Sequence, residues 1–369
     1  MRSLLSRALI LLALTASAFA QAADPIQAAL DKKDYATAFK LVKPIADQGD
    51  PQALAMLGGL YADGLGVKAN LTEAAAQWRK AADKNYAPAQ YNLGLLYATG
   101  RGVKRDYAEA FKWIKAAADQ NMPEAQRDTA SMYEGGQGVK RDYSLAAEYY
   151  RKAANQGLPE AQFAMGSAYA AGRGVTKDMN ESLSWYTKAA NTGMPDAMFN
   201  LGAMYFAGQG VAKNPTEALA WTKKAADKGH PQAMMNLGLM YINGQGVTKD
   251  KAQALTWFSK ANGQKFPEAL GAIRAMAEEG YAPAQVEMGL AFENGRGVPK
   301  LVSEAVSWYR EAALQNNAAG EYHYGRMYAA GTGVPQSDAE ATSWFEKAAK
   351  QGHAQAKARL KPTTAAKAK

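Results

Sequence analysis

Apolar and small side chains recur along this 369-residue chain with helical spacing, in blocks that repeat every 36 residues. In the block 195–229, Ala197, Leu201 and Tyr205 lie four residues apart and therefore share one face of a helix. A short glycine-rich segment interrupts the pattern, and a second helical stretch follows it. Each block therefore predicts two helices joined by a tight loop, called helix A and helix B below.

The loop between the two helices carries the pattern Gly-x-Gly-Val. Glycine reaches positive φ without steric cost, so this pattern is typical of a tight turn between helices. The second glycine recurs at a step of 36 residues and once at a longer step of 51, at Gly66, Gly102, Gly138, Gly174, Gly210, Gly246, Gly297 and Gly333.

Helix B begins with a capping signal in most blocks. Asn214, then Pro215 and Glu217, match a capping box with proline at the first helical position. The same start occurs at Asp106, Asp178, Asp250 and Ser337. The Leu301 block lacks a capping side chain, so we expect a looser loop there and a helix that starts from Ser303.

This period predicts an all-α solenoid of about eight 36-residue helix-turn-helix repeats, in which each unit buries its apolar face against its neighbours. A helix without a following Gly-x-Gly-Val loop is expected from Pro267 to Gly280. The predicted organisation is a signal peptide at 1–22, an N-terminal half-repeat cap at 23–49, regular repeats at 50–262, an irregular extra-helix insertion at 263–283, further repeats and a capping helix at 284–361, and a disordered tail at 362–369.

The seven tryptophans are assigned to one position of helix B, with Tyr149 in the remaining unit. We predict that these rings are core plugs that lock helix B onto the A helices. Glycines such as Gly202 lie in the middle of helix A, where glycine costs about 1 kcal/mol against alanine. A close approach of helix B is the expected reason.

Residues 1–22 are typical of a secretory signal, with Arg2 and Arg7 before an apolar run and small residues around Ala20. The apolar run is shorter than the roughly 20 residues that span a bilayer, so we predict cleavage after Ala20 or Ala22, no transmembrane segment afterwards, and a periplasmic or secreted protein. The formal net charge is +9, but the basic residues recur at repeat positions, so a nucleic-acid partner is not expected.

Sequence motifs for catalysis or cofactor binding are missing. The chain has no cysteine and no Ser-x-x-Lys or Gly-Lys sequence. Its histidines, His230, His323 and His353, are too far apart in sequence for a His-x-x-x-His metal motif. We therefore predict no enzyme activity, no catalytic residues, and no cofactor or metal site.

The repeat resembles the Sel-one-like repeat (SLR) family, relatives of the tetratricopeptide repeats. The resemblance rests on Leu201-Gly202-x-x-Tyr205, on Gly208-x-Gly210-Val211, and on Ala218-x-x-Trp221-x-x-x-Ala225-Ala226. It implies a right-handed α/α superhelix that acts as a scaffold or adaptor for other proteins. One cysteine-rich secreted branch is associated with β-lactam binding or hydrolysis, and this chain departs from that branch because it has no cysteine.

In solenoids of this kind helix A lines the inner, concave wall, which the resemblance places as the binding groove. Aromatic and apolar side chains there would anchor a ligand and the asparagine amides would bond its backbone, although the aromatics could instead pack against the adjoining helix A. The predicted partner-binding residues are Tyr91, Asn92, Arg127, Phe163, Phe199, Asn200, Met235, Asn236 and Tyr322.

The favoured function is an exported interaction scaffold or adaptor that binds a peptide or partner protein in this groove, in a bacterial envelope process. The alternative is a polysaccharide- or peptidoglycan-associated envelope protein, which could carry weak hydrolase (β-lactamase-like) activity. Exposed tryptophan rings would favour the alternative, because sugars stack on them.

Overall fold

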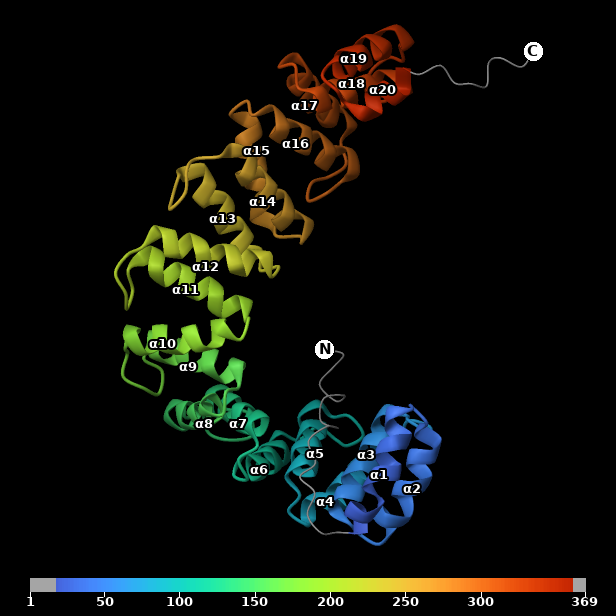
Figure 1. The fold of residues 1–369 in the computed structure, drawn as a ribbon, viewed down its shortest axis with the longest axis vertical. Coiled ribbons are helices and arrows are strands. Elements are labelled where there is room, and N and C mark those ends of the chain that lie inside the picture. Colours follow the sequence, from blue (N-terminus) through green and yellow to red (C-terminus); the bar gives the residue numbers. More distant parts are fainter. Residues whose placement is uncertain (1–17, 361–369) are drawn as a thin grey trace, which may run out of the picture. The chain divides into compact units, whose positions relative to one another are not determined.

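The computed structural model describes residues 18–360, and every regular element among them is a helix (Figure 1). The contacts divide the chain into unit 1, up to Thr192, and unit 2, from Gly193. Residues 1–17 of the predicted signal peptide and the predicted tail 362–369 lie outside the described residues. The helices of unit 1 are α1 (Ala18–Asp31), α2 (Tyr35–Asp47), α3 (Pro51–Asp63), α4 (Leu71–Asp83), α5 (Ala87–Thr99), α6 (Tyr107–Ala118), α7 (Pro123–Gly135), α8 (Tyr143–Asn155), α9 (Pro159–Ala171) and α10 (Met179–Asn191).

Unit 2 continues the same helical pattern with one extra helix. Its helices are α11 (Pro195–Ala207), α12 (Pro215–Asp227), α13 (Pro231–Asn243), α14 (Lys251–Gly263), α15 (Pro267–Glu278), α16 (Ala282–Asn294), α17 (Val302–Leu314), α18 (Ala318–Ala330), α19 (Asp338–Lys350) and α20 (Ala354–Leu360). The extra helix α15 contacts α14 and α16 and is the helix predicted from Pro267. In unit 1, α1 precedes α2, so the segment predicted as a half-repeat contains part of α1 and all of α2.

Within each unit, consecutive helices pack on one another, so a B helix contacts its own A helix and the next helix of the same unit. Each A helix of a repeat ends at a left-handed glycine, such as Gly136 with φ 67°. The second loop glycine lies close to the preceding B helix: a Cβ at Gly138 would overlap the carbonyl oxygen of Tyr107. The Gly-x-Gly-Val loop thus serves both the turn and the packing of neighbouring repeats.

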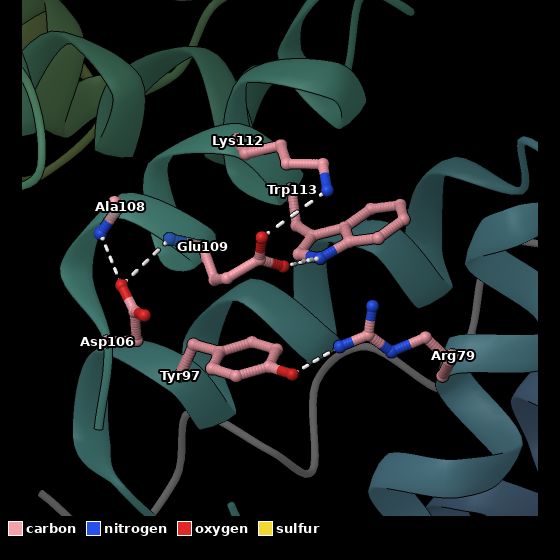
Figure 2. Close-up of polar contacts among 7 residues, drawn as sticks. All are labelled: Arg79, Tyr97, Asp106, Ala108, Glu109, Lys112 and Trp113. Atoms are coloured by element: carbon pink, nitrogen blue, oxygen red, sulfur yellow. Dashed lines mark hydrogen bonds and ion pairs between the residues drawn. The ribbon is translucent and has the colours of Figure 1, made fainter. Parts of the chain in front are cut away.

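The side-chain caps are confirmed, but the reciprocal half of the capping box is replaced (Figure 2). Asp106 accepts from the backbone N–H groups of Ala108 and Glu109 at 2.9 and 3.1 Å. The N–H of Asp106 bonds the carbonyl of Tyr97 on helix A at 3.0 Å, and the Glu109 carboxylate accepts from Trp113 Nε1. Helix A therefore fixes where helix B begins.

The same backbone bond explains why the prediction for the Leu301 block was wrong. The N–H of Leu301 donates to the carbonyl of Phe292 at 3.1 Å. Helix α17 begins at Val302 in the usual register although no side chain caps it, and the loop keeps its two left-handed glycines, Gly295 and Gly297. The backbone bond to helix A holds the start without a cap.

The mid-helix glycines of helix A are confirmed as points of close approach, but the assignment of all seven tryptophans to one position was wrong for Trp78. Trp78 lies 35 residues before Trp113, so it occupies the next position of the repeat. That next position faces the glycine: a Cβ at Gly58 would lie 2.5 Å from Nε1 of Trp78. In the other units with a mid-helix glycine it holds Ile114, Tyr186, Thr222, Phe258, Tyr309 and Phe345, and in the unit with Ala130 it holds Tyr150.

The remaining tryptophans lie one residue earlier, and their burial varies. Trp113, Trp185 and Trp257 are buried, at 8%, 7% and 6% exposure. Trp221, Trp308 and Trp344 are only half-buried. Lysine side chains cover several of the rings, with Lys224 Nζ 3.8 Å from the centroid of Trp221. The three half-buried rings are therefore amphipathic edges of the packing rather than central plugs, whereas the buried rings agree with the predicted core role.

Candidate functional site

The four predicted partner-binding residues of unit 1 have different surroundings. Tyr91 is only 6% exposed, and its hydroxyl donates to Asp128 at 2.7 Å. Asp128 also pairs with Arg127 at 2.6 Å, so Tyr91 and Arg127 meet through one carboxylate. Asn92 is buried, and its Oδ1 has no hydrogen-bond partner within the described residues. Phe163 is half-buried and packs against Tyr186, with 5.3 Å between the ring centroids.

The aromatic residues of unit 2 pack against side chains at helix starts. Phe199 stacks on His230 at 4.7 Å, and His230 Nδ1 caps helix α13 by accepting from the N–H of Ala233. Tyr322 is 8% exposed and stacks on His353. The sequence left open that the aromatic side chains are packed inside the protein rather than free for a ligand, and this is the case for Tyr91 and Tyr322.

Three other predicted residues of unit 2 remain accessible. Asn200, Met235 and Asn236 are half-buried. Their partial exposure leaves both asparagine amides within reach of water or of a ligand.

One predicted residue, Phe163, lines a cavity of about 240 Å³ in unit 1, called the Phe163 cleft below. Helix α8 supplies two tyrosine rings and two alanines, α9 supplies Phe163 with small residues, and α7 supplies one carboxylate. The lining residues are Glu134, Tyr143, Ala146, Ala147, Tyr150, Phe163, Ala164, Ser167, Ala168 and Arg173. Most of the wall is apolar. The space between the helices stays open because its alanines are too small to fill it.

The polar lining of the Phe163 cleft is joined through Glu134. The Glu134 carboxylate accepts from the Tyr150 hydroxyl at 3.1 Å and pairs with Arg173 at 3.2 Å. Burial, followed by the charge of Glu134, raises the pKa of Tyr150 well above its ordinary value. Tyr150 is therefore a neutral donor at physiological pH. The cleft can accept an apolar side chain, with fixed polar groups beside its entrance.

Sequence reasoning missed Glu134, Tyr150 and Arg173. A signal was present: the position of Glu134 holds alanine at Ala62, Ala98, Ala170 and Ala329, and the only other glutamate there is Glu293. Ala130 also replaces the mid-helix glycine in this repeat. Departures from the repeat pattern, rather than the pattern itself, mark the cleft.

The described part of the chain offers no cluster of three metal-ligating side chains. None of its helices is long and apolar enough to cross a membrane.

Comparison with known sequences and structures places the repeat in a family. The Sel1 repeat matches nine segments, at residues 30–50, 51–86, 87–122, 123–158, 159–194, 195–230, 231–264, 282–317 and 318–353. The α15 region lies outside these matches. No curated protein matches the chain.

Two solved structures are similar over most of the chain. One is c5321, a protective antigen present in uropathogenic Escherichia coli strains and displaying an SLR fold: it is 37% identical with a TM-score of 0.61, over 87% of this chain and 66% of that one. The chain thus spans just under two thirds of that antigen. The other is a Sel1 repeat protein from Oxalobacter formigenes, 32% identical with a TM-score of 0.58, over 65% of this chain and 96% of that one. The chain therefore belongs to the Sel1 repeat family, and its fold is an all-α repeat solenoid.

Proposed function

We propose that this protein is an exported adaptor that binds a peptide segment of a partner protein on its A-helix wall, with the Phe163 cleft as an anchor site. Sel1 repeat proteins generally mediate protein–protein interaction. The observation that carries the finer proposal is the cleft itself, whose apolar walls and polar rim combine a pocket for one anchor side chain with groups for a neighbouring backbone. Its volume suits one side chain of a peptide rather than a folded domain.

The alternative of a carbohydrate-binding envelope protein requires aromatic faces that a sugar can reach. Trp221 is half-exposed, which favours that alternative more than the sequence suggested. However, Lys224 lies over its ring, as Lys347 lies over Trp344 at 3.7 Å. The adaptor therefore remains the better-supported function.

The peptide-binding proposal is tested by selection from a displayed library of random peptides on the full-length protein, followed by calorimetric affinities. We expect the selected peptides to share one large apolar residue. Ala164→Leu places a larger side chain in the cleft and should weaken binding about tenfold or more, equivalent to about 1.4 kcal/mol. Ala252→Leu adds the same side chain at an exposed position of α14 and should change nothing.

The proposal fails if Ala164→Leu binds the selected peptides like the unmodified protein while its circular dichroism spectrum and thermal melting are unchanged. It also fails if Ala252→Leu weakens binding equally, because the effect would then not belong to the cleft.

Export is a separate part of the proposal. It is supported by the signal-like residues 1–22 and by the similarity to a protein described as a protective antigen. We expect the protein isolated from a bacterial periplasmic fraction to begin after Ala20 or Ala22 by intact mass. A cytoplasmic protein that retains Met1 would contradict it.

A further inference from the structure

A second cleft, of about 250 Å³, lies in unit 2 among helices α16, α18 and α20. It is called the Arg326 cleft below. Its polar lining consists of Glu293, Arg326, Thr332 and Arg359, and Met327 with two alanines provides the apolar part. In contrast to the Phe163 cleft, charged residues make up a large part of its lining.

Among the described residues that line the Arg326 cleft, Glu293 is the one acid, and each of its carboxylate oxygens accepts a hydrogen bond. Glu293 accepts from the buried Tyr309 hydroxyl at 2.6 Å and from Arg326 at 2.5 Å. Burial opposes its ionisation, but these hydrogen bonds and the charge of Arg326 outweigh burial and lower the pKa of Glu293. Glu293 is therefore ionised and neutralises one arginine.

The two arginines of the cleft keep hydrogen-bond donors that no described residue uses. Nε of Arg326 is buried and donates no hydrogen bond to any described residue. Arg359 is exposed, lines the same cleft, and pairs with no carboxylate among residues 18–360. Among the described lining residues, two guanidinium groups and one carboxylate give the Arg326 cleft a positive charge next to the half-buried Thr332 hydroxyl.

We propose that the Arg326 cleft binds a carboxylate group of a peptide, from a side chain or from a chain terminus. Guanidinium groups form charge-assisted hydrogen bonds with a carboxylate, and Thr332 supplies a hydroxyl donor. A monoanion fits better than a dianionic phosphate because Glu293 would repel the second charge. Met327 and the alanines accommodate the aliphatic part of an acidic residue. This site does not depend on the Phe163 cleft, because the two lie in different units and bind different chemistry.

The test uses the full-length protein with four probe peptides. They are acetyl-Ala-Ala-Glu-amide, acetyl-Ala-Ala-Ala with a free carboxylate, acetyl-Ala-Ala-Gln-amide, and acetyl-Ala-Ala-Glu with both carboxylates. The readout is the NMR signal of each arginine Nε–H group during titration. We expect the Arg326 and Arg359 signals to shift with carboxylate peptides and not with the Gln-amide peptide. The first two probes distinguish a side-chain from a terminal carboxylate.

Arg359→Gln should weaken the response about tenfold without loss of fold, because Arg359 is exposed and lacks an acidic partner in the described residues. Arg310→Gln removes an exposed arginine outside the cleft and serves as the matched control. Equal shifts with the neutral peptide, no shift with any carboxylate probe, or unchanged binding in Arg359→Gln would each overturn the proposal.

Discussion

The Phe163 cleft and the Arg326 cleft share four lining positions of the repeat in different units, yet their linings differ. Both contain a glutamate near the end of helix A that accepts from a tyrosine of helix B: Glu134 with Tyr150, and Glu293 with Tyr309. Both also contain one arginine paired with that glutamate. The shared Glu–Tyr pair therefore does not decide what each cleft can bind.

The difference comes from where the arginine originates. In unit 1, Arg173 lies in the loop after α9, and the pair with Glu134 is exposed, with 52% and 36% of the two side chains accessible. In unit 2, Arg326 lies on helix α18 at the position that Ser167 has in unit 1. The side chain of Arg326 is 30% accessible and that of its partner Glu293 is 24% accessible. A loop arginine leaves the apolar walls free, whereas a helix arginine becomes part of the wall.

Side-chain size completes the contrast. Ala147 and Ala164 of the Phe163 cleft correspond to Val306 and His323 in unit 2. The larger residues fill the apolar space, and Nδ1 of His323 is buried without a hydrogen-bond partner in the described chain. A few substitutions on one scaffold thus exchange an apolar pocket for a charged one.

The largest expected effect concerns acid sensitivity. Burial first, then the charge of Arg326, lowers the pKa of His323 from 6.5 to about 4, against a smaller opposite effect of Glu293. Between these values the unfolded chain binds a proton that the folded chain does not, so unit 2 loses stability as the pH falls from 6.5 toward 4. The shift corresponds to up to about 3 kcal/mol.

Calorimetric melting at pH 7 and pH 5 measures this loss. His323→Ala, which restores the residue of unit 1, should reduce the drop in the melting temperature. All three histidines lie in unit 2, and burial also lowers the pKa of His353, so His353→Gln is the matched control for the remaining acid sensitivity. An unchanged drop in His323→Ala would refute the assignment.

The next largest expected effect is a difference in stability loss between alanine substitutions of Glu293 and Glu134. Glu293→Ala leaves the Tyr309 hydroxyl, at 0% residue exposure, and Arg326 without their partner, which should cost about 2 kcal/mol. Glu134→Ala breaks a more exposed pair and should cost less than about 1 kcal/mol. Hydrogen exchange with mass spectrometry on α16–α18 and α7–α9 reads each region separately, which suits a repeat array whose unfolding need not be two-state.

A rescue experiment sharpens this result. Adding Arg326→Ser to Glu293→Ala removes the unpaired charge and introduces the hydroxyl that Ser167 has in unit 1, so part of the lost protection should return. Equal losses at both glutamates would mean that burial of the ion pair does not distinguish the clefts.

Much of the fold could be predicted from the sequence because its signals are local. Left-handed glycines such as Gly136 and caps such as Asp106 determine where helices end and begin within a few residues. The packing register was less accessible: two adjacent aromatic positions of helix B look alike in sequence, and only the close approach of Trp78 to Gly58 shows which one faces helix A.

The clefts were harder to predict because each depends on residues from several helices. Phe163 was identified from its position on helix A, but the cavity beside it exists because Ala146, Ala147 and Ala164 are small together. Tyr91 belongs to the same position of the repeat and is buried instead, since Asp128 on the next helix A accepts its hydroxyl. Equivalent positions thus acquire different environments from their neighbours.

The smallest expected effect tests why Tyr309 is fully buried while the equivalent Tyr150 is half-buried. Helix A has glycine at Gly289 beneath the Tyr309 ring but alanine at Ala130 in the equivalent place of unit 1. A Cβ at Gly289 would lie 2.5 Å from Cδ1 of Tyr309. Gly289→Ala should therefore combine an overpacking cost of about 2 kcal/mol with a helix-propensity gain of about 1 kcal/mol, a net loss of about 1 kcal/mol.

Gly271→Ala, in α15, is the matched control, because a Cβ there meets no atom within 4 Å. It gains the helix propensity without the overpacking and should stabilise its helix by about 1 kcal/mol. Hydrogen exchange of α15 and α16 in both variants gives the two values. If both alanines stabilised their helices equally, the close approach of Tyr309 to Gly289 could not explain why its ring is more deeply buried than that of Tyr150.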